Sequence, residues 1–274
     1  MKIKNLIIHI VMIVTVIVGS INLGFAQDSS QVSSTVNLDL GADIVSRYVW
    51  RGTQLGGASP NIQPYIEMGI GNFVIGTWGA YSLGGDNPFQ EFDLYATYNL
   101  FDDKVSITLT DYFFPDESSD YKYFDYADTT TGHIFEASVS FNGTDKIPFS
   151  VFIAVNLYGA DASRISDNPA SLNSLDGIQN STYLELGYET SLNSGVKFEA
   201  FVGFNLTDPR SADLSGSGYV GETGFYGNDI GVVNLGITVS KDIKISEDFS
   251  LPMMTSVITN PQAQKVYLVF GFSL

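Results

Sequence analysis

The stretch Val36-Asn37-Leu38-Asp39-Leu40-Gly41-Ala42-Asp43-Ile44 alternates apolar with polar or small residues at a period of two. Because successive side chains of a β-strand point to opposite faces, one face of this segment is apolar and the other carries carboxylates. The alternation continues with Tyr48 and Trp50 on the apolar face and with Arg47 and Arg51 on the polar face. Residues 36–50 are therefore predicted to form one strand whose two faces meet different environments.

The same alternation returns along the rest of the chain, and every second connection between the alternating segments is short. Gly71-Asn72 is a two-residue hairpin signal, whereas 115–132, 159–180 and 207–229 are loops of 18 to 23 residues. A soluble sandwich could alternate too, but it has no reason to put short turns at one end and long loops at the other. We therefore predict an all-β fold, a membrane-spanning antiparallel up-and-down β-barrel of about twelve strands with both termini periplasmic. The predicted strands are 36–50, 61–70, 73–82, 89–100, 105–114, 133–141, 147–158, 181–190, 196–206, 230–240, 249–259 and 265–274.

The final strand has an unbroken apolar face that runs from Val266 to Leu274. It resembles the C-terminal strand by which outer-membrane barrels are recognised, so we expect the barrel assembly machinery as a partner. Asp111 and the pair Val232-Val233 disturb the alternation of two other strands. A bulge or the end of the lipid-facing band is expected at Asp111, and Val232-Val233 blurs the phase of its strand.

The N-terminus has the layout of a secretory signal peptide. Lys2 and Lys4 precede an apolar run at 6–18, and Gly24-Phe25-Ala26 offers small residues for cleavage before Gln27. A permanent transmembrane anchor is the alternative, but 13 apolar residues fall short of the roughly 20 that a spanning helix needs. We expect a cleaved signal peptide at 1–26, a periplasmic lead at 27–35 and an outer-membrane barrel at 36–274, in contact with lipid and lipopolysaccharide.

Composition excludes several classes of function. The chain has 30 acidic and 13 basic residues, a formal charge of -17 and no basic run, which argues against nucleic-acid binding. It has no cysteine, so disulfides, thiolate zinc sites and cysteine nucleophiles are ruled out. His133 is the single histidine outside the signal peptide, and no serine follows it at the second position. No enzyme activity, metal site or cofactor is therefore expected, and the G-x-G-x-x-G match at 216–221 is predicted to be a loop because it opens no helix.

In the predicted register, nine acidic and three basic side chains face the lumen and are the candidate pore-lining residues. A lumen with this balance favours cations, which predicts passive passage of small solutes or ions with a cation preference. In the alternative, the charges pair across a narrow barrel and fill it. The candidates are Asp39, Asp43, Arg47, Arg51, Glu67, Glu91, Asp93, Glu136, Glu185, Glu189, Lys197 and Glu199.

Two local features allow more than one interpretation. Arg47 and Arg51 could form a constriction that orients an anionic group, or they could neutralise neighbouring carboxylates. The loop 115–132 combines carboxylates with aromatic residues, and it could be a solvated acidic loop, a Ca²⁺ site or a surface for a glycan or a partner. The second class of function is accordingly a non-conducting surface barrel whose loops bind a partner, glycan or divalent cation.

Four segments carry a family resemblance. Ser46-Arg47-Tyr48-Val49-Trp50-Arg51-Gly52 and Pro60-Asn61-Ile62-Gln63-Pro64 resemble the first hairpin of the TorF-like putative porins. Glu91-Phe92-Asp93-Leu94-Tyr95 and Tyr267-Leu268-Val269-Phe270-Gly271 are similar to later segments of that family. The resemblance implies a porin-type outer-membrane barrel, and it implies no particular substrate and no catalytic residues.

Overall fold

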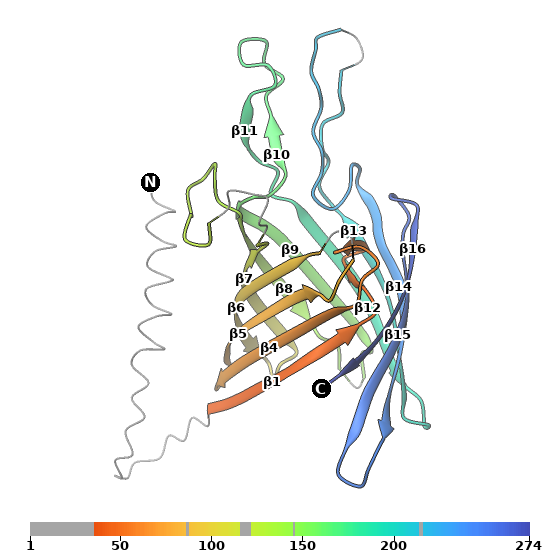
Figure 1. Ribbon diagram of the computed structural model, residues 1–274. Helices are drawn as coiled ribbons and strands as arrows, with labels where there is room; N and C mark the ends of the chain where they lie inside the picture. Colours follow the sequence, from red (N-terminus) through yellow and green to blue (C-terminus); the bar gives the residue numbers. More distant parts are fainter. Residues whose placement is uncertain (1–35, 86–87, 116–121, 145, 214–215) are drawn as a thin grey trace, which may run out of the picture. The chain divides into compact units, whose positions relative to one another are not determined.

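Twelve antiparallel strands close into a barrel in the computed structural model (Figure 1). The structure describes residues 36–85, 88–115, 122–144, 146–213 and 216–274, so the predicted signal peptide and lead lie outside the described residues. Each wall strand pairs with the wall strands before and after it along the chain, and β1 pairs with β16 to close the ring, which confirms the up-and-down topology. The wall consists of β1 (Val36–Val45), β4 (Asn61–Ile70), β5 (Phe73–Ser82), β6 (Gln90–Leu100), β7 (Val105–Phe113), β8 (His133–Phe141), β9 (Phe149–Gly159), β12 (Thr182–Ser191), β13 (Val196–Asn205), β14 (Gly231–Lys244), β15 (Ser250–Asn260) and β16 (Lys265–Ser273).

Two small hairpins stand apart from the wall. They are β2 (Tyr48–Trp50) with β3 (Thr53–Leu55), and β10 (Ser163–Ile165) with β11 (Leu175–Ile178). The second extends the long loop after β9 beyond the rim of the barrel (Figure 1). Within the described residues, no helix is long and apolar enough to cross a membrane.

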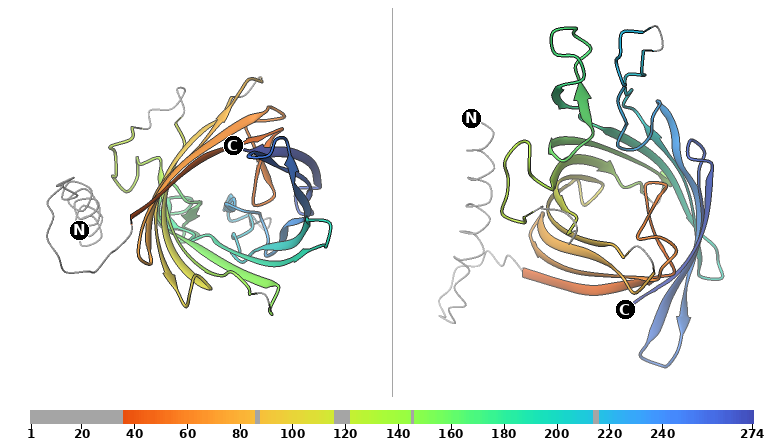
Figure 2. Two further views of the ribbon diagram at one scale, coloured as in Figure 1. Left: turned by 90° about the horizontal axis from the view of Figure 1, so that it is seen from below. Right: turned by 45° about the horizontal axis from the view of Figure 1, so that its top comes forward.

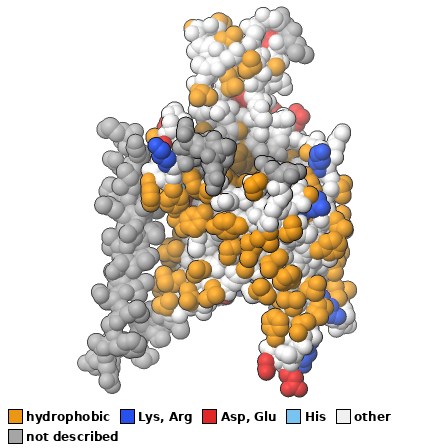
Figure 3. All heavy atoms as spheres, viewed as in Figure 1, with side chains coloured by type: hydrophobic (Ala, Val, Ile, Leu, Met, Phe, Trp, Pro, Cys, Tyr) orange, Lys and Arg blue, Asp and Glu red, His pale blue; other side chains and the backbone are white. Residues whose placement is uncertain are grey.

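The outer face of the wall is apolar. Leu40 in β1 is 67% exposed and Val266 in β16 is 70% exposed, and apolar side chains of the strands between them are exposed at alternate positions. Figure 3 shows these side chains as a band across the barrel wall. A soluble monomer rarely exposes a continuous apolar surface of this extent, whereas a barrel in lipid requires one. The alternation predicted for these strands is confirmed.

The seam between β1 and β16 is much shorter than the other joints. The β1–β4 ladder joins ten residue pairs, whereas the β1–β16 ladder joins three, from Asp43 opposite Ser273 to Val45 opposite Gly271. Backbone hydrogen bonds between Ala42 and Leu274 at one end, and from Ser46 to Phe270 at the other, extend the seam slightly. The N-terminal half of β1 is therefore paired on one side only.

The first predicted strand ends earlier than expected. β1 stops at Val45, the last residue of its ladders with β4 and β16, and the chain then bends inward. Tyr48 and Trp50 were predicted on the lipid face, and this prediction is wrong because both belong to the β2–β3 hairpin. The missed signal is the two-residue turn Arg51-Gly52, whose φ angles of 48° and 80° suit a tight hairpin.

The two disturbed positions have different explanations. The β13–β14 register shifts next to Val232 and Val233, so a bulge accounts for the lost alternation there. β7 pairs with both neighbours without a shift, and Asp111 faces outward at the end of the apolar band. There its Oδ1 lies 2.7 Å from Nδ1 of His133, within hydrogen-bond distance. The His133 ring is fully buried and packs against Tyr123 and Tyr126 of the long loop.

Candidate functional site

The β2–β3 hairpin folds into the lumen, where its turn reaches β15 (Figure 2). Gly52 lies against β14, because a Cβ atom built on it would sit 1.9 Å from the Val233 carbonyl oxygen. The Gly52 carbonyl accepts a hydrogen bond of 3.2 Å from Asn260 Nδ2 in β15. A glycine at this turn allows both the positive φ angle and the close approach.

Arg51 is the centre of the contacts that hold the hairpin. Its guanidinium donates two hydrogen bonds, of 2.5 and 2.8 Å, to the Glu136 carboxylate in β8, and a third of 2.5 Å reaches the Tyr226 hydroxyl. The Arg51 side chain is 9% exposed and that of Glu136 is 2% exposed. Burial of two charges is costly unless they are paired and hydrogen-bonded, and the two-bond geometry meets that condition.

Aromatic rings surround the same guanidinium. Its central carbon lies 4.6 Å from the centre of the Trp50 ring, 5.1 Å from Phe152 and 4.8 Å from Tyr183. Tyr226, from the loop after β13, approaches at 5.4 Å. These contacts are within the range of cation–π attraction, so the pocket for Arg51 is built from three wall strands, the hairpin and a long loop.

The remaining hairpin side chains contact the near wall. Tyr48 packs against Trp78 of β5 at 5.6 Å and against Phe89 at 6.1 Å, and Trp50 packs against Tyr112 of β7 at 5.7 Å. The hairpin thus touches the wall on both sides of the lumen. We refer to the Tyr48–Leu55 segment, together with Tyr226, as the lumen plug.

Two acidic side chains lie buried beside the plug, and neither forms an ion pair with a described residue. Glu91 and Asp93 of β6 are 1% and 5% exposed. Glu91 Oε2 and Asp93 Oδ1 have no hydrogen-bond partner among the described residues. Both side chains lie on the face of β6 opposite to the exposed Leu94.

The other six predicted acids lie toward the short-turn end of the lumen or along its wall. Glu67 accepts a hydrogen bond of 2.6 Å from Tyr95, and Asp43 accepts one of 2.6 Å from Ser273. Lys197 bridges Glu189 at 2.8 Å and Glu199 at 3.1 Å. Asp39 is exposed and Glu185 is half-buried, so the lumen outside the plug keeps an excess of negative charge.

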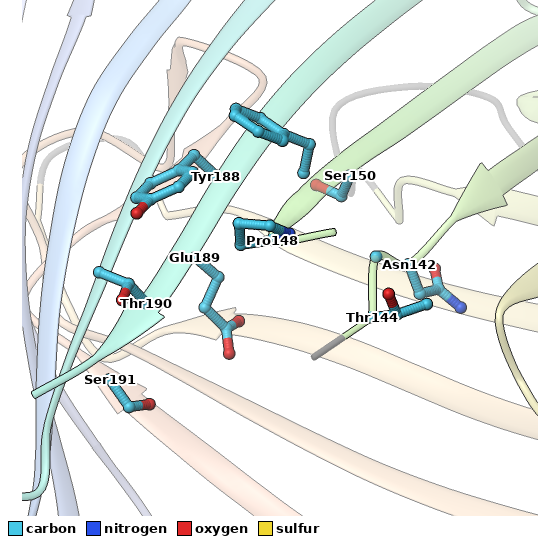
Figure 4. Close-up of a pocket in the computed structure, with 10 residues that line it drawn as sticks. Asn142, Thr144, Pro148, Ser150, Tyr188, Glu189, Thr190 and Ser191 are labelled. Atoms are coloured by element: carbon cyan, nitrogen blue, oxygen red, sulfur yellow. The ribbon is translucent and has the colours of Figure 1, made fainter. Parts of the chain in front are cut away.

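Two cavities open along this wall. One of about 570 Å³ lies between the β8–β9 turn and the end of β12, and Figure 4 shows the Glu189 side chain extending there. The second, of about 360 Å³, lies next to Arg51 and is lined by Phe152, Glu185 and Phe201 among others. Both are within or near the roughly 300–1,000 Å³ range of small-molecule sites.

Of the two predicted lumen arginines, one neutralises a carboxylate, because Arg51 pairs with Glu136. Arg47 instead donates a hydrogen bond of 3.1 Å to Gln54 within the hairpin, and its Nε has no partner among the described residues. Neither residue lies on a wall strand, which corrects their predicted placement on the first strand. The aromatic partners Phe152, Tyr183 and Tyr226 were not predicted, because they come from distant segments.

The long loops after β9 and β13 meet outside the barrel at a buried carboxylate, among other contacts. Glu222, whose side chain is fully buried, pairs with Arg164 at 2.6 Å and with Arg210 at 2.7 Å, and it accepts backbone N–H bonds from Ile165 and Arg210. Burial would raise its pKa, but these hydrogen bonds outweigh burial and lower the pKa to about 2. The G-x-G-x-x-G segment 216–221 lies in this loop, and no helix follows it in the described chain.

A metal site in the long loops is not supported by the described residues. Across the described ranges, no group of three or more His, Asp or Glu side chains could hold a metal ion. Part of the acidic loop, at 116–121, lies outside the described residues. The calcium interpretation of that loop therefore stays a prediction.

Comparison with solved structures finds distant similarity to membrane channels. An outer membrane channel from Pseudomonas putida F1 matches with a TM-score of 0.39 and 8% identity, over 91% of this chain and 97% of that chain. OmpF from Salmonella typhi in complex with daunomycin matches with a TM-score of 0.36 and 8% identity, over 86% and 96% of the two chains. The assignment of the barrel rests on the strand pairing of this chain.

Sequence comparison identifies the family. No curated protein matches this chain. A family model described as a bacterial protein of unknown function, Gcw_chp, matches residues 28–215. It does not carry the TorF-like name, so that resemblance stays a prediction. Since the match covers more than half of the sequence, the chain belongs to the Gcw_chp family of bacterial proteins.

Proposed function

We propose that this protein is a porin-like channel of the bacterial outer membrane for passive passage of small solutes or ions. The observation that carries the proposal is a closed twelve-stranded barrel with an apolar outer face and a charged inner face. Closed barrels satisfy every backbone hydrogen bond inside lipid, and alternation gives them a polar interior. Passage through the wall-lined lumen is the simplest use of that architecture, and no enzymatic role is proposed.

The charge of the lumen supports a preference for cations. Among the described residues, no basic side chain lies within ion-pair distance of Asp39, Asp43, Glu67 or Glu185, and Lys197 is shared by two further carboxylates. Carboxylates along a narrow low-dielectric passage raise the local concentration of cations and repel anions. The lumen plug is then the constriction, held by the Arg51–Glu136 ion pair.

A second candidate function is favoured by the same plug. The hairpin and Tyr226 occupy the lumen near the long-loop rim, and the loops beyond are tied together through Glu222. A non-conducting surface barrel whose loops bind a partner, glycan or divalent cation would have these two features. The two candidates differ in whether ions cross the membrane.

The proposed location implies several partners. Outer-membrane lipid and lipopolysaccharide would cover the apolar band, whose exposed residues in β16 include Val266, Leu268 and Phe270. The barrel assembly machinery would bind that same closing strand. Secretion by the predicted signal peptide at 1–26 completes the route to the outer membrane.

The deciding experiment is single-channel recording in a planar bilayer under a salt gradient. The full chain is expressed in a Gram-negative host, extracted in detergent, and compared with the triple variant Asp39→Asn, Glu67→Gln, Glu185→Gln. The wild type is expected to give stepwise currents with a cation-selective reversal potential, and the triple variant a weaker selectivity. Glu247→Gln, in the exposed β14–β15 turn, is the matched control. A folded protein that never conducts would contradict the channel and favour the surface barrel.

A further inference from the structure

The cavity of about 360 Å³ beside the lumen plug has an unusual combination of walls. Four aromatic side chains, Trp50, Phe152, Tyr183 and Phe201, line it together with the carboxylate of Glu185. Its only basic neighbour among the described lining residues, Arg51, is already bound on Glu136. The free charge in this aromatic cavity is therefore negative.

Glu185 presents a free acceptor to the cavity. Glu185 Oε2 accepts hydrogen bonds from the Tyr183 hydroxyl and, at 2.9 Å, from Asn234 Nδ2. These bonds fix the amide of Asn234, because its oxygen would be repelled if it faced the carboxylate. Asn234 Oδ1 is then left without a donor, although the side chain is buried, and no donor in the described chain reaches Glu185 Oε1. One oxygen of the Glu185 carboxylate therefore remains free to accept a hydrogen bond from a ligand.

Neighbouring glycines make room for the aromatic walls. A Cβ atom on Gly236 would lie 2.3 Å from the ring of Phe201, and one on Gly203 would lie 2.0 Å from the Tyr183 hydroxyl. Larger residues at these two positions would push both rings out of place. The glycines of β13 and β14 therefore leave the space that these two aromatic rings occupy.

We propose that this cavity is a binding site for a small primary ammonium ion that carries an aromatic ring. The ammonium group would donate to Glu185 Oε1, and the ring would pack between Phe152 and Phe201. Aromatic faces attract cations and flat apolar groups, and a buried acceptor favours a ligand that brings a donor. An anion would be repelled by Glu185, and an inorganic cation would leave the aromatic walls uncovered. The proposal rests on the proposed function, since it names the class of solute that the lumen would admit.

The test is calorimetric titration of phenethylammonium chloride into the full chain in detergent. Saturable binding is expected for the wild type. Affinity is expected to fall about tenfold or more in Glu185→Gln, which keeps the shape but removes the charge, and in Phe201→Ala, which removes one wall. Glu247→Gln and Phe101→Ala, both in exposed turns at the other end of the strands, are the matched controls and should bind like the wild type. 3-Phenylpropionate and propylammonium, which each lack one of the two required features, should bind far more weakly.

Several results would overturn the site. Equal binding of 3-phenylpropionate, unchanged affinity in Glu185→Gln, or absence of binding to a folded wild type would each do so. Folding of every variant is checked by heat-dependent mobility in detergent gels. If Phe201→Ala does not fold, Ile258→Trp fills the same cavity from β15 and should also abolish binding.

The titration distinguishes failure of the binding-site proposal from failure of the channel proposal. Binding in detergent requires no current, so a silent barrel that binds phenethylammonium would contradict the channel and keep the site. A conducting barrel that does not bind it would contradict the site and keep the channel.

Discussion

Arg51 on the β2–β3 turn and Glu136 in β8, 85 positions apart in the chain, form a two-bond ion pair inside the lumen. Removal of one partner leaves the other charge buried and unpaired, which typically costs about 3–5 kcal/mol. The short β2–β3 ladder cannot offset a cost of this size. The pair therefore decides whether the plug stays in place.

Arg51→Ala is expected to release the hairpin and to raise single-channel conductance severalfold in planar bilayers. Arg47→Ala, which removes a hydrogen bond to Gln54 inside the same hairpin, is the control and should change conductance much less. Equal conductance in the wild type and Arg51→Ala would mean that the plug does not restrict the passage.

Gly52→Ala should displace the same hairpin by steric clash. The added methyl group would meet the Val233 carbonyl at 1.9 Å, and the residue already has a φ angle of 80°. Gly57→Ala is the matched control, because its φ angle of 69° is similar while no atom lies within 4 Å of the new Cβ. Both substitutions add about 1 kcal/mol of backbone strain. A larger drop in melting temperature for Gly52→Ala than for Gly57→Ala therefore measures the effect of the clash with Val233.

The joined outer loops should loosen in acid. The pKa of Glu222 is about 2 in the folded chain against an ordinary value of 4.5, so its ionised form stabilises the loops. This contribution is fully present above about pH 5 and is lost as the pH falls toward 2. Hydrogen exchange of peptides from 163–178 and 206–224, corrected for intrinsic rate, should rise over that window.

Glu222→Gln provides the corresponding test at neutral pH. The variant should show fast exchange in both loops at every pH and lose the acid dependence. Asp176→Asn, an exposed acid in β11, is the control and should behave like the wild type. Persistent protection in Glu222→Gln would show that other contacts join the loops.

His133 is expected to hold the loop after β7 against the outer rim. Its two ring nitrogens contact Asp111 Oδ1 at 2.7 Å and the Tyr123 carbonyl oxygen at 2.6 Å. His133→Phe removes both hydrogen bonds and leaves buried acceptors, at a cost of about 1–3 kcal/mol each. Proteolysis within 122–131 should accelerate, and the added change Asp111→Leu should restore part of the resistance.

The wall of the barrel was predictable from sequence because its signal is local. Side chains along each strand point alternately to lipid and to the water-filled side. The polarity of neighbouring residues such as Leu38 and Asp39 therefore indicates which face each one occupies. The plug was not predictable by the same reasoning. Its alternation from Arg47 to Arg51 continues that of β1 without interruption, although the chain has left the wall by then.

The candidate site was predictable in part. The register placed Glu67, Glu185 and Glu199 on the inner face, and the structure places them there. It could not indicate that Tyr226 and Phe152 meet Arg51, because those contacts join segments about one hundred residues or more apart. Pairing across a lumen depends on the closure of the barrel, which no short stretch encodes.

The three-pair seam between β1 and β16 also has a kinetic consequence. Its partners Asp43 and Ser273 are 230 positions apart, so this contact forms only after all intervening strands have been laid down in order. Loop-closure entropy makes such a distant pairing slow, and the short ladder stabilises it only weakly once it has formed. The seam is therefore the joint at which ring closure limits the rate of assembly, and at which mechanical or thermal opening of the finished ring would begin.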